Sequence, residues 1–293
     1  MKVVLFCGGH GMRMREGPGS VPKPMVMIGD RPLLWHVMRY YAHFGHTEFV
    51  LCLGYGAAAV KEYFLRYDET LSNDFTLNFT GDDGFAAPRR RLSVGGRDLE
   101  LHSTDITDWK ITFIDTGLRS TIGERLLRVR AQVEGEPMFL ANYADTLTDA
   151  PLPDMIEQFR RTDATVSILA VPPFSTHHVL DFDAAGTVLR VRESQDLMQW
   201  ENGGYFVMRQ GIFDALREGE DMVPHAFNRL LAQQRLFAYP FQGFWRAADT
   251  FKDRVELEEM YHRGACPWMV WDAQRHSAVV AADGRPVGAP AAG

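Results

Sequence analysis

The stretch KVVLFCGGHGMR, at residues 2–13, is the part of the sequence that says most about the fold. A strand-like apolar run leads directly into a loop that contains Gly8, Gly9 and Gly11. Glycines allow the backbone to approach a phosphate closely, and their amide groups can form an anion-binding nest. The stretch therefore favours a phosphate-binding loop after the first strand, with a simple tight turn as the alternative.

The spacing of these glycines excludes two common phosphate loops. A dinucleotide fingerprint needs a third glycine where this chain has Met14, and a Walker loop needs Gly-Lys followed by Ser or Thr, which is not found near here. What remains is a short loop containing Arg13, followed by Lys23 between two prolines. Because prolines restrict the backbone on both sides, we expect the Lys23 ammonium group to be directed rather than mobile. A solvated surface lysine is the alternative.

Further along, short apolar runs alternate with helical patterns, in the segments 2–7, 32–45, 48–54 and 58–67. This alternation is typical of βαβ units. It predicts an α/β protein with a Rossmann-like, mostly parallel mixed sheet flanked by helices. In the first helix the apolar side chains at helical spacing predict the core face, and Gly45 predicts its end; the face comprises Leu33, Leu34, Val37, Met38 and Tyr41.

The pattern breaks between about residues 66 and 109, where turn-rich segments separate short β-like pieces. We interpret this as an inserted, hairpin-rich excursion. The sheet resumes at 109–115 and 137–145, where each run ends in a polar residue at the expected carboxyl edge, the edge that binds ligands. Then follow a helix at about 151–161, a strand at 165–171, a hairpin at 181–193, the segment 202–208, and helices near 226–234 and 253–264.

We expect one domain over residues 1–272 and a disordered tail at 273–293, which is rich in Ala, Gly and Pro. The formal charge of -7 argues against nucleic acid as a partner, because such proteins usually carry a net basic face. No apolar run approaches the roughly 20 residues that span a bilayer, so we expect no membrane association and a cytoplasmic location. Three scattered cysteines indicate buried thiols rather than disulfides or zinc; these are Cys7, Cys52 and Cys266.

With these motifs in place, the sequence resembles the sugar-phosphate nucleotidyltransferases, and most closely the glucose-1-phosphate cytidylyltransferases. That family opens with a strand, a GGxGxR loop and a PKPM segment, matched here by Gly8, Gly9, Gly11, Arg13 and residues 22–25. The similarity continues nearly to residue 272, through Leu34-Trp35-His36, Gly54-Tyr55, Asp115-Thr116-Gly117, Asn202-Gly203-Gly204, Gly243-Phe244-Trp245, Asp249-Thr250 and residues 265–268. The resemblance implies a fold of the nucleotide-diphospho-sugar transferase type.

The resemblance also implies a reaction: transfer of a nucleotidyl group from CTP to glucose 1-phosphate, giving CDP-glucose and pyrophosphate. Arg13 and Lys23 inherit contacts to the triphosphate. Asp115, Thr116 and Gly123 lie where the family contacts the base, and the Asp-Thr-Gly form resembles cytidylyltransferases more than thymidylyltransferases. One departure is that Met12 stands where the family usually has Thr or Ser. Backbone amides could still form the phosphate cradle without that hydroxyl.

Chemistry at an α-phosphate needs an in-line nucleophile and compensation of negative charge, commonly by Mg²⁺ with hard oxygen ligands. Asp145 and Asp249 occupy the positions at which the resembled family binds its metal, and Asp145 joins Lys23 and Arg13 as a catalytic candidate. From the residues alone, turn formation or helix capping would be the better interpretation of these aspartates. The chain shows no convincing nucleophile motif of the Ser-His-Asp or Cys-His kind, which fits a direct displacement.

The acceptor end departs from the family pattern. The family reads its sugar phosphate partly with a Glu-Lys pair ahead of an Asn-Gly-Gly strand. Here Glu193, Asn202 and Gly203 are present, but Ser194 follows the glutamate. Arg192, or Arg190 in the same hairpin, could supply the missing charge, because a guanidinium fork suits phosphate.

Two other functions stay open at this point. A nucleotidyltransferase could use UTP, dTTP or another sugar-phosphate or phosphonate acceptor, as Met12 and Ser194 suggest. A non-catalytic, nucleotide-binding regulatory subunit belongs to a different class. The resemblance further implies a homo-oligomer and a role in deoxysugar or surface polysaccharide synthesis.

Overall fold

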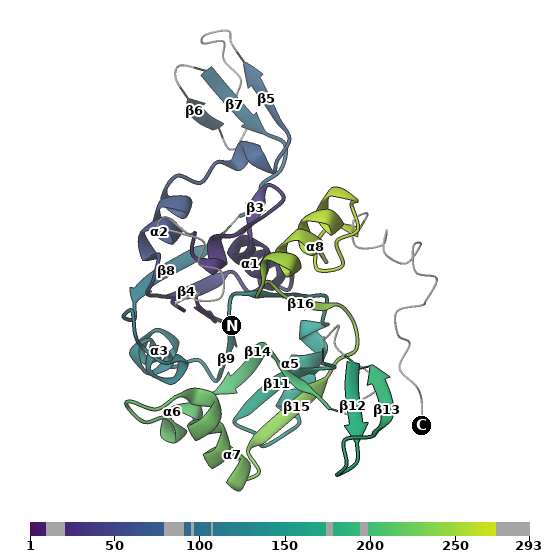
Figure 1. The fold of residues 1–293 in the computed structure, drawn as a ribbon. Coiled ribbons are helices and arrows are strands. Elements are labelled where there is room, and N and C mark those ends of the chain that lie inside the picture. The colour runs from purple at the N-terminus through teal and green to yellow at the C-terminus, as the bar shows by residue number, and fades with distance from the viewer. Residues whose placement is uncertain are drawn as a thin grey trace.

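The computed structural model describes residues 1–9, 21–78, 91–94, 97–106, 108–173, 178–193 and 199–273. A seven-stranded sheet runs through the centre of this described part (Figure 1). From one edge to the other its strands are β15 (Leu236–Pro240), β11 (Val166–Val171), β14 (Glu201–Arg209), β9 (Met138–Asn142), β1 (Val3–Phe6), β4 (Glu48–Leu53) and β8 (Lys110–Asp115). The strand predicted directly before the glycine loop is therefore β1, near the middle of the sheet.

Most neighbouring strands in this sheet are parallel. β1 pairs in parallel with β4 and β9, β4 with β8, and β11 with β15. Only β14 runs against its neighbours β9 and β11. The expected mostly parallel mixed sheet is confirmed, and the carboxyl ends of β1, β4, β8 and β9 meet at one edge.

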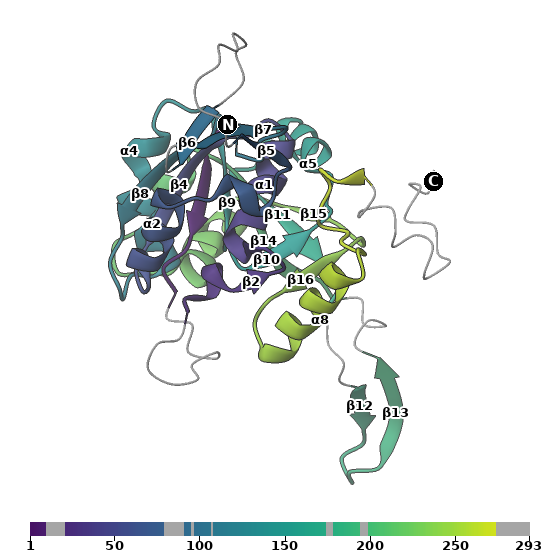
Figure 2. The same cartoon turned by 90° about the horizontal axis from the view of Figure 1, so that it is seen from above.

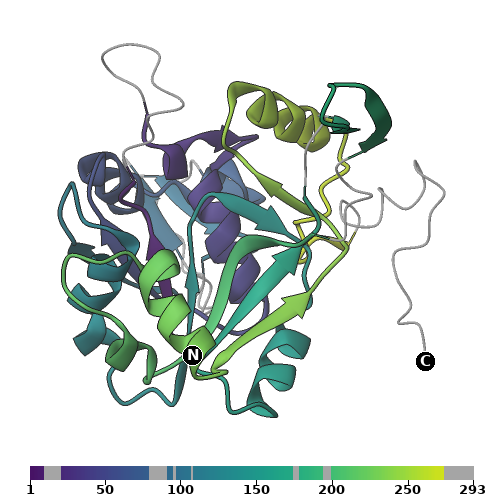
Figure 3. The same cartoon turned by 60° about the horizontal axis from the view of Figure 1, so that its bottom comes forward.

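Helices cover both faces of the sheet (Figure 3). Along β1 the side chains alternate: Val3 and Leu5 face one apolar core, and Val4 and Phe6 face the other. The first core is closed by α1 (Leu33–His43), α2 (Ala57–Leu65) and α5 (Leu152–Arg160). The second is closed by α3 (Ile122–Arg128), α4 (Arg130–Val133), α6 (Ile212–Ala215), the π-helical segment η5 (Met222–Phe227) and α7 (Asn228–Ala232).

α1 confirms the predicted core face, since all five predicted side chains are fully buried. Gly45 ends the helix in the left-handed region, at φ +81°, as glycine allows. The helix also buries Trp35, His36 and Tyr40, which lie outside that face. It is covered there because the Trp35 indole donates to the Tyr67 hydroxyl at 2.8 Å and the His36 ring meets the Ile28 carbonyl at 2.9 Å.

The excursion after α2 forms a small sheet that stands away from the body of the molecule (Figure 1). After the short helix η3 (Glu69–Leu71), strand β7 (Arg97–Leu101) pairs antiparallel with β5 (Phe75–Asn78) and β6 (Arg91–Val94). The hairpin-rich insertion expected for this stretch is thus present in the described residues.

A second projection is the hairpin of β12 (His178–Phe182) and β13 (Val188–Glu193), which pair antiparallel and stand away from the body (Figure 2). Several of its apolar side chains are exposed; these are Leu180, Phe182, Val188, Leu189 and Val191. The predicted hairpin is confirmed, and its first strand begins three residues earlier than expected.

The remaining elements frame the edge of the sheet where the site lies. They are η2 (Lys23–Met25), β2 (Met27–Ile28), β3 (Arg31–Pro32), β10 (Thr146–Thr148), β16 (Trp245–Ala247) and α8 (Phe251–His262). The three cysteines are free and buried, as predicted. In the described segments no helix is long and apolar enough to cross a membrane. Gly11, Arg13, Ser194 and nearly all of the predicted tail lie outside the described residues.

Candidate active site

Lys23 reaches the carboxyl edge of the sheet from the short helix η2. Pro22 precedes it in an extended conformation, at φ -60° and ψ 142°. The Pro22 ring packs against Gly56, which adopts φ +70° and has no room for a Cβ atom beside that ring. The Lys23 side chain is only 16% exposed. The prolines therefore hold this lysine inward, which agrees with the directed ammonium group expected from the sequence.

Asp145 and Asp249 are brought side by side by a short two-stranded ladder. Asp145 precedes β10, Asp249 follows β16, and the two strands pair antiparallel with Thr146 opposite Ala247. The Ala248 amide donates to the Asp145 carbonyl at 3.0 Å, which extends the ladder to the aspartates. Asp145 sits in a tight turn in which Ala144 adopts φ +60° and donates its amide to the Asn142 side chain at 2.6 Å.

The Lys23 ammonium group lies between the two carboxylates. It donates to Asp145 Oδ2 at 2.7 Å and also to Asp249 Oδ1. Burial alone would lower the pKa of Lys23, but the attraction of Asp145 and Asp249 outweighs it and raises the pKa above the ordinary lysine value. Lys23 is therefore a cation at neutral pH. Burial raises the pKa of Asp145, and the neighbouring ammonium group partly offsets this.

The helix-capping alternative for Asp249 is wrong, because its neighbour does the capping. The Thr250 hydroxyl accepts from the Asp253 amide at 3.1 Å, and the Asp253 carboxylate accepts from the Thr250 amide at 2.8 Å. This reciprocal capping box starts α8. The carboxylate of Asp249 is thereby left to face Lys23.

The donor set at this cluster suits a hard cation. Carboxylate oxygens are the ligands that Mg²⁺ prefers, and Mg²⁺ usually takes only one or two carboxylates and completes its shell with phosphate and water. Asp145 and Asp249 provide two carboxylates within reach of one ammonium group. Among the residues described, no group of three or more His, Cys, Asp or Glu side chains is placed to hold a metal. The two aspartates fit a nucleotide-bound Mg²⁺ better than an all-protein metal cage.

The start of the glycine loop is held by a buried arginine that the sequence analysis missed. Arg125, 2% exposed, donates to the Gly8 carbonyl at 2.7 Å, to the Leu53 carbonyl at 3.1 Å and to the Thr116 hydroxyl at 2.7 Å. One guanidinium thus joins the ends of β1, β4 and β8. A Cβ atom on Gly8 would overlap this guanidinium, so the glycine is needed for the close approach.

The residues expected near the base lie on the same edge. Thr116 is fully buried and donates its hydroxyl to the Leu53 carbonyl at 2.7 Å. Asp115 ends β8 and accepts the Gly117 amide at 2.9 Å, which shapes the turn. Gly123 lies in the first turn of α3, packed against the Glu220 carbonyl. The structure therefore groups Gly8 and Thr116 around Arg125, with Asp115 next to Thr116 in the chain, and Gly123 lies in the same helix as Arg125.

On the acceptor side, Asn202 and Gly203 open β14 close to the turn that carries Asp145. The Asn202 amide donates to the Tyr143 hydroxyl at 3.1 Å, and the Trp245 indole donates to the Gly203 carbonyl at 2.8 Å. Burial raises the pKa of Tyr143 to about 12, so the phenol stays neutral. Tyr143 is a second residue that the sequence analysis missed, two positions before Asp145.

Glu193 and Arg192 lie apart from this cluster. Glu193 ends β13, and the Arg192 guanidinium pairs with Asp181 across the hairpin at 2.8 Å. The hairpin stands away from the body in Figure 2. The structure thus brings Lys23 together with Asp145 and Asp249, and it joins Gly8 to Thr116 through Arg125. It places Asn202 beside Tyr143 and leaves Arg192 with a different partner.

A lysine and two aspartates lie at the carboxyl edge of a mostly parallel sheet whose strand β1 leads into Gly8 and Gly9. These features define a class of protein: a nucleotidyltransferase with the nucleotide-diphospho-sugar transferase fold. Solved structures show the same fold. A UDP-glucose pyrophosphorylase complexed with UDP-glucose matches with a TM-score of 0.62 at 16% identity, over 89% of this chain and 98% of that one. A putative glucose-1-phosphate thymidylyltransferase from Bacillus anthracis matches with a TM-score of 0.60 at 13% identity, over 89% and 94%.

Sequence comparison narrows the class to a family. A probable glucose-1-phosphate cytidylyltransferase of Bacillus subtilis (strain 168) is 34% identical over 274 residues, which cover 92% of this chain and 100% of the relative. A glucose-1-phosphate cytidylyltransferase of Salmonella typhi is 32% identical over 277 residues, 93% of this chain and 100% of the relative. No protein-family model matches the sequence. The chain belongs to the glucose-1-phosphate cytidylyltransferase family.

Proposed function

We propose that the protein joins CTP to glucose 1-phosphate and releases CDP-glucose and pyrophosphate. The observation that supports this most directly is the placement of Lys23 between Asp145 and Asp249 at the carboxyl edge of the sheet. Family membership supplies the substrates, since both relatives named above are described as acting on glucose 1-phosphate with a cytidylyl group.

The proposed step is a direct displacement. An oxygen of the sugar phosphate attacks the α-phosphorus of the nucleotide, a new P–O bond forms, and the bond to the bridging oxygen of pyrophosphate breaks. Such a transfer depends on alignment and charge compensation rather than on a protein nucleophile. Mg²⁺ held by Asp145 and Asp249 would supply charge compensation at the phosphates.

In the proposed mechanism, Lys23 is the residue of the chain that binds the phosphate oxygens with its positive charge. Its ammonium group is charged and buried, and in the described structure it is neutralised by carboxylates. Phosphate oxygens offer it an equivalent partner, so nucleotide binding exchanges one charge-assisted contact for another. The amides of Gly8, Gly9 and Gly11 with Arg13 would cradle the triphosphate, and Asp115, Thr116 and Gly123 would line the base.

For the acceptor we propose that Asn202 and Gly203 contact the sugar, with Glu193, and that Arg192 binds its phosphate. Arg192 would first have to leave Asp181, with which it now pairs at 2.8 Å. Both this requirement and the presence of Ser194 where the family has lysine support a second candidate function. In it, the acceptor is not glucose 1-phosphate or the nucleotide is not CTP.

The test is a matrix of reactions with the full-length chain and Mg²⁺. CTP, UTP, dTTP, GTP and ATP are each paired with glucose 1-phosphate, mannose 1-phosphate, galactose 1-phosphate and a phosphonate analogue, and pyrophosphate release is measured. The proposal expects the highest kcat/KM for CTP with glucose 1-phosphate and loss of activity on chelation of the metal. Preference for another pair would establish the second candidate. Absence of turnover with every pair would support a regulatory, nucleotide-binding subunit instead.

We further propose that the protein acts in the cytoplasm as a homo-oligomer. The exposed apolar side chains of the β12–β13 hairpin support self-association, because two-stranded ribbons are marginally stable when they are not packed. Light scattering coupled to size-exclusion chromatography tests this, and a monomer at micromolar concentration would contradict it.

A further inference from the structure

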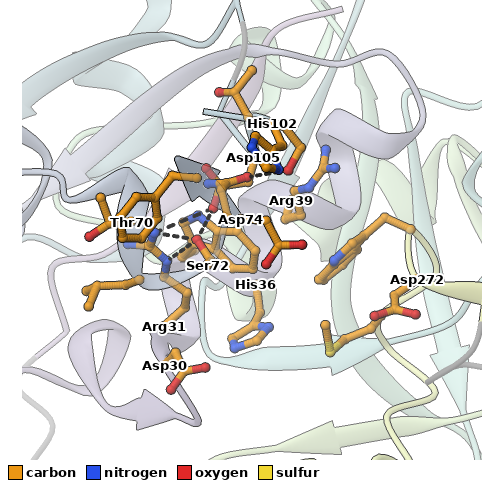
Figure 4. A pocket seen from close by; sticks show the side chains of 18 of the residues that line it. Asp30, Arg31, His36, Arg39, Thr70, Ser72, Asp74, His102, Asp105 and Asp272 are labelled. Atoms are coloured by element: carbon orange, nitrogen blue, oxygen red, sulfur yellow. Dashed lines mark hydrogen bonds and ion pairs between the residues drawn. The ribbon is translucent and has the colours of Figure 1, made fainter. Parts of the chain in front are cut away.

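A cavity of about 1070 Å³ is lined by residues outside the Lys23 cluster, and Figure 4 shows side chains of this lining. It is bounded by the turn before β3, the first turns of α1, the excursion around η3 and β5, and the segment after α8. None of Lys23, Asp145, Asp249, Asn202 or Gly203 lines it. A cavity of this volume can hold a ligand that is larger than a single small metabolite.

Aromatic rings form one side of this cavity. Trp35 and Trp271 meet edge to face with centroids 5.8 Å apart, and His36 lies 6.2 Å from Trp271. Tyr261, in the last turn of α8, adds a further ring and donates its hydroxyl to Asp30 at 3.0 Å. Aromatic faces carry partial negative charge, which attracts the polarised C–H groups of a ligand.

The charged side chains of the lining disfavour an anion. Four aspartates line the cavity and two arginines oppose them; these are Asp30, Asp74, Asp105 and Asp272, with Arg31 and Arg39. Arg31 is already engaged, since it donates to the Asp68 carbonyl at 2.7 Å and lies 3.5 Å from Asp105. A nucleotide or free phosphate would meet a net negative lining, which repels it.

A simple cation does not fit the cavity well either, because the lining includes an arginine N–H group that lacks a hydrogen-bond acceptor. Arg39 Nε is buried without a hydrogen-bond partner in the described part of the chain, and its guanidinium lies 5.9 Å from the Trp271 ring centroid. Thr104 Oγ1 and Asp105 Oδ1 are buried and equally unpaired there, and Asp105 is only 8% exposed. Buried polar atoms without partners are rare and cost about 1–3 kcal/mol each.

These unpaired atoms define what a ligand should offer. Arg39 Nε–H needs an acceptor, Asp105 Oδ1 needs a donor, and the Thr104 hydroxyl can serve as either. Neighbouring atoms cover these three groups, so a ligand reaches them only when the side chains turn toward the cavity. Asp74, which lines the cavity and is exposed, presents a further acceptor without such a movement.

We propose that this cavity is a binding site for a neutral saccharide, separate from the catalytic site. A sugar hydroxyl both donates and accepts, carries no charge, and is attached to a ring whose C–H face can stack on the partly buried Trp271. Such a ligand can hydrogen-bond to the carboxylates and to Arg39 at the same time. An anion would be repelled by the aspartates, and a cation would be repelled by Arg39.

The proposal is tested by exposing the labelled full-length protein to an array of neutral oligosaccharides built from glucose, mannose, galactose and rhamnose. The saccharide that binds best is then titrated calorimetrically against the protein, alongside spermidine and inorganic pyrophosphate. We expect saturable binding of at least one neutral saccharide and no binding of spermidine at the same site. Pyrophosphate bound at the catalytic site should not compete with it.

Two variants locate the site. Asp74→Ala removes an exposed rim carboxylate, and Trp271→Ala removes a ring of the aromatic wall; each should weaken saccharide binding at least tenfold. Asp214→Asn, on α6, is the control and should leave binding unchanged, since Figure 1 shows α6 far from β3, β5 and α8, which bound the cavity. Asp74→Ala should also leave pyrophosphate release unchanged. The proposal is overturned if no neutral glycan binds, if spermidine or pyrophosphate occupies the cavity instead, or if Asp74→Ala binds saccharide as the unaltered protein does.

Discussion

The Lys23 cluster and the β12–β13 hairpin are built in opposite ways. The cluster draws on three chain segments that are anchored in the core by η2 and by the β10–β16 ladder. The hairpin stands away from the body, with its apolar side chains exposed and Arg192 paired within the hairpin itself. The first region is fixed by the packing of the whole domain, and the second depends on local pairing.

The difference separates the chemistry from the choice of acceptor. Lys23, Asp145 and Asp249 all match the family pattern, whereas the missing lysine at Ser194 falls beside the hairpin. A core-anchored cluster cannot change one member without disturbing the others, because each carboxylate contacts the same ammonium group. A projecting hairpin can change its side chains with little effect on the fold. We therefore expect the residues of the catalytic step to tolerate little change, and the residues that recognise the acceptor to tolerate more.

The strongest test of this contrast is Asp145→Asn. The substitution keeps the size of the side chain but removes the charge that attracts Lys23 and would hold a metal. We expect the rate of pyrophosphate release to fall by at least about 10³-fold, equivalent to about 4 kcal/mol in the transition state. Asp154→Asn, an exposed position on α5, is the control, and circular dichroism should show both variants folded. Retention of a tenth of the activity by Asp145→Asn would remove Asp145 from the catalytic machinery.

A second test concerns the arginine that joins three strand ends. Arg125→Met fills most of the same space but leaves the Gly8 carbonyl and Thr116 hydroxyl without their donor. We expect the free energy of unfolding to fall by about 2–4 kcal/mol and the KM for the nucleotide to rise. Urea denaturation and steady-state kinetics measure the two effects. Arg160→Met, at an exposed arginine on α5, is the control and should cause much smaller changes.

The hairpin is tested by a pair of substitutions with opposite expected effects. Arg192→Ala should raise the KM for the sugar phosphate about tenfold, or about 1.4 kcal/mol, with kcat little changed. Asp181→Ala frees Arg192 from its ion pair and should lower the same KM. Arg190→Ala tests the other arginine of the hairpin that could bind this phosphate, and Arg217→Ala, at an exposed arginine outside the hairpin, is the control. If Arg192→Ala leaves the KM unchanged, another group binds the acceptor phosphate.

The smallest effect is expected in the turn that presents Asp145. Ala144 adopts φ +60°, a left-handed conformation that costs a residue with a Cβ atom about 1–2 kcal/mol. Ala144→Gly relieves this strain but raises the conformational entropy of the unfolded chain, which offsets part of the gain. We expect a net stabilisation of about 0.5–1 kcal/mol. The midpoint of urea unfolding reports it. Ala131→Gly, on the exposed side of α4, should instead destabilise the protein by a similar amount.

The sequence was sufficient to predict the sheet, the core face of α1 and a Lys23 ammonium group that is directed rather than mobile. These features depend on local patterns: alternating apolar runs, helical spacing and flanking prolines. Arg125 could not be predicted in this way, because an arginine in a charged helical segment is usually solvated. Its burial depends on how α3 meets the ends of β1 and β4.

The partner of Arg192 is a similar case. Its ion pair with Asp181 follows from the register of the hairpin, which shifts by an irregularity between Asp181 and Phe182. The distant cavity also escaped prediction, since its wall is assembled from the excursion, α1 and the end of α8. Contacts between segments far apart in the sequence leave no periodic signal within any one of them.

Helix α8 links two places that are otherwise separate. Asp249 lies immediately before its cap, and Tyr261 lies in its last turn beside the cavity. Twelve residues of α-helix measure about 18 Å and resist compression along their axis. The helix also meets the β2–β3 turn, where Glu258 accepts the Gly29 amide at 2.6 Å. A ligand that displaced Tyr261 would therefore be expected to move the start of the helix as well, and with it the carboxylate beside Lys23.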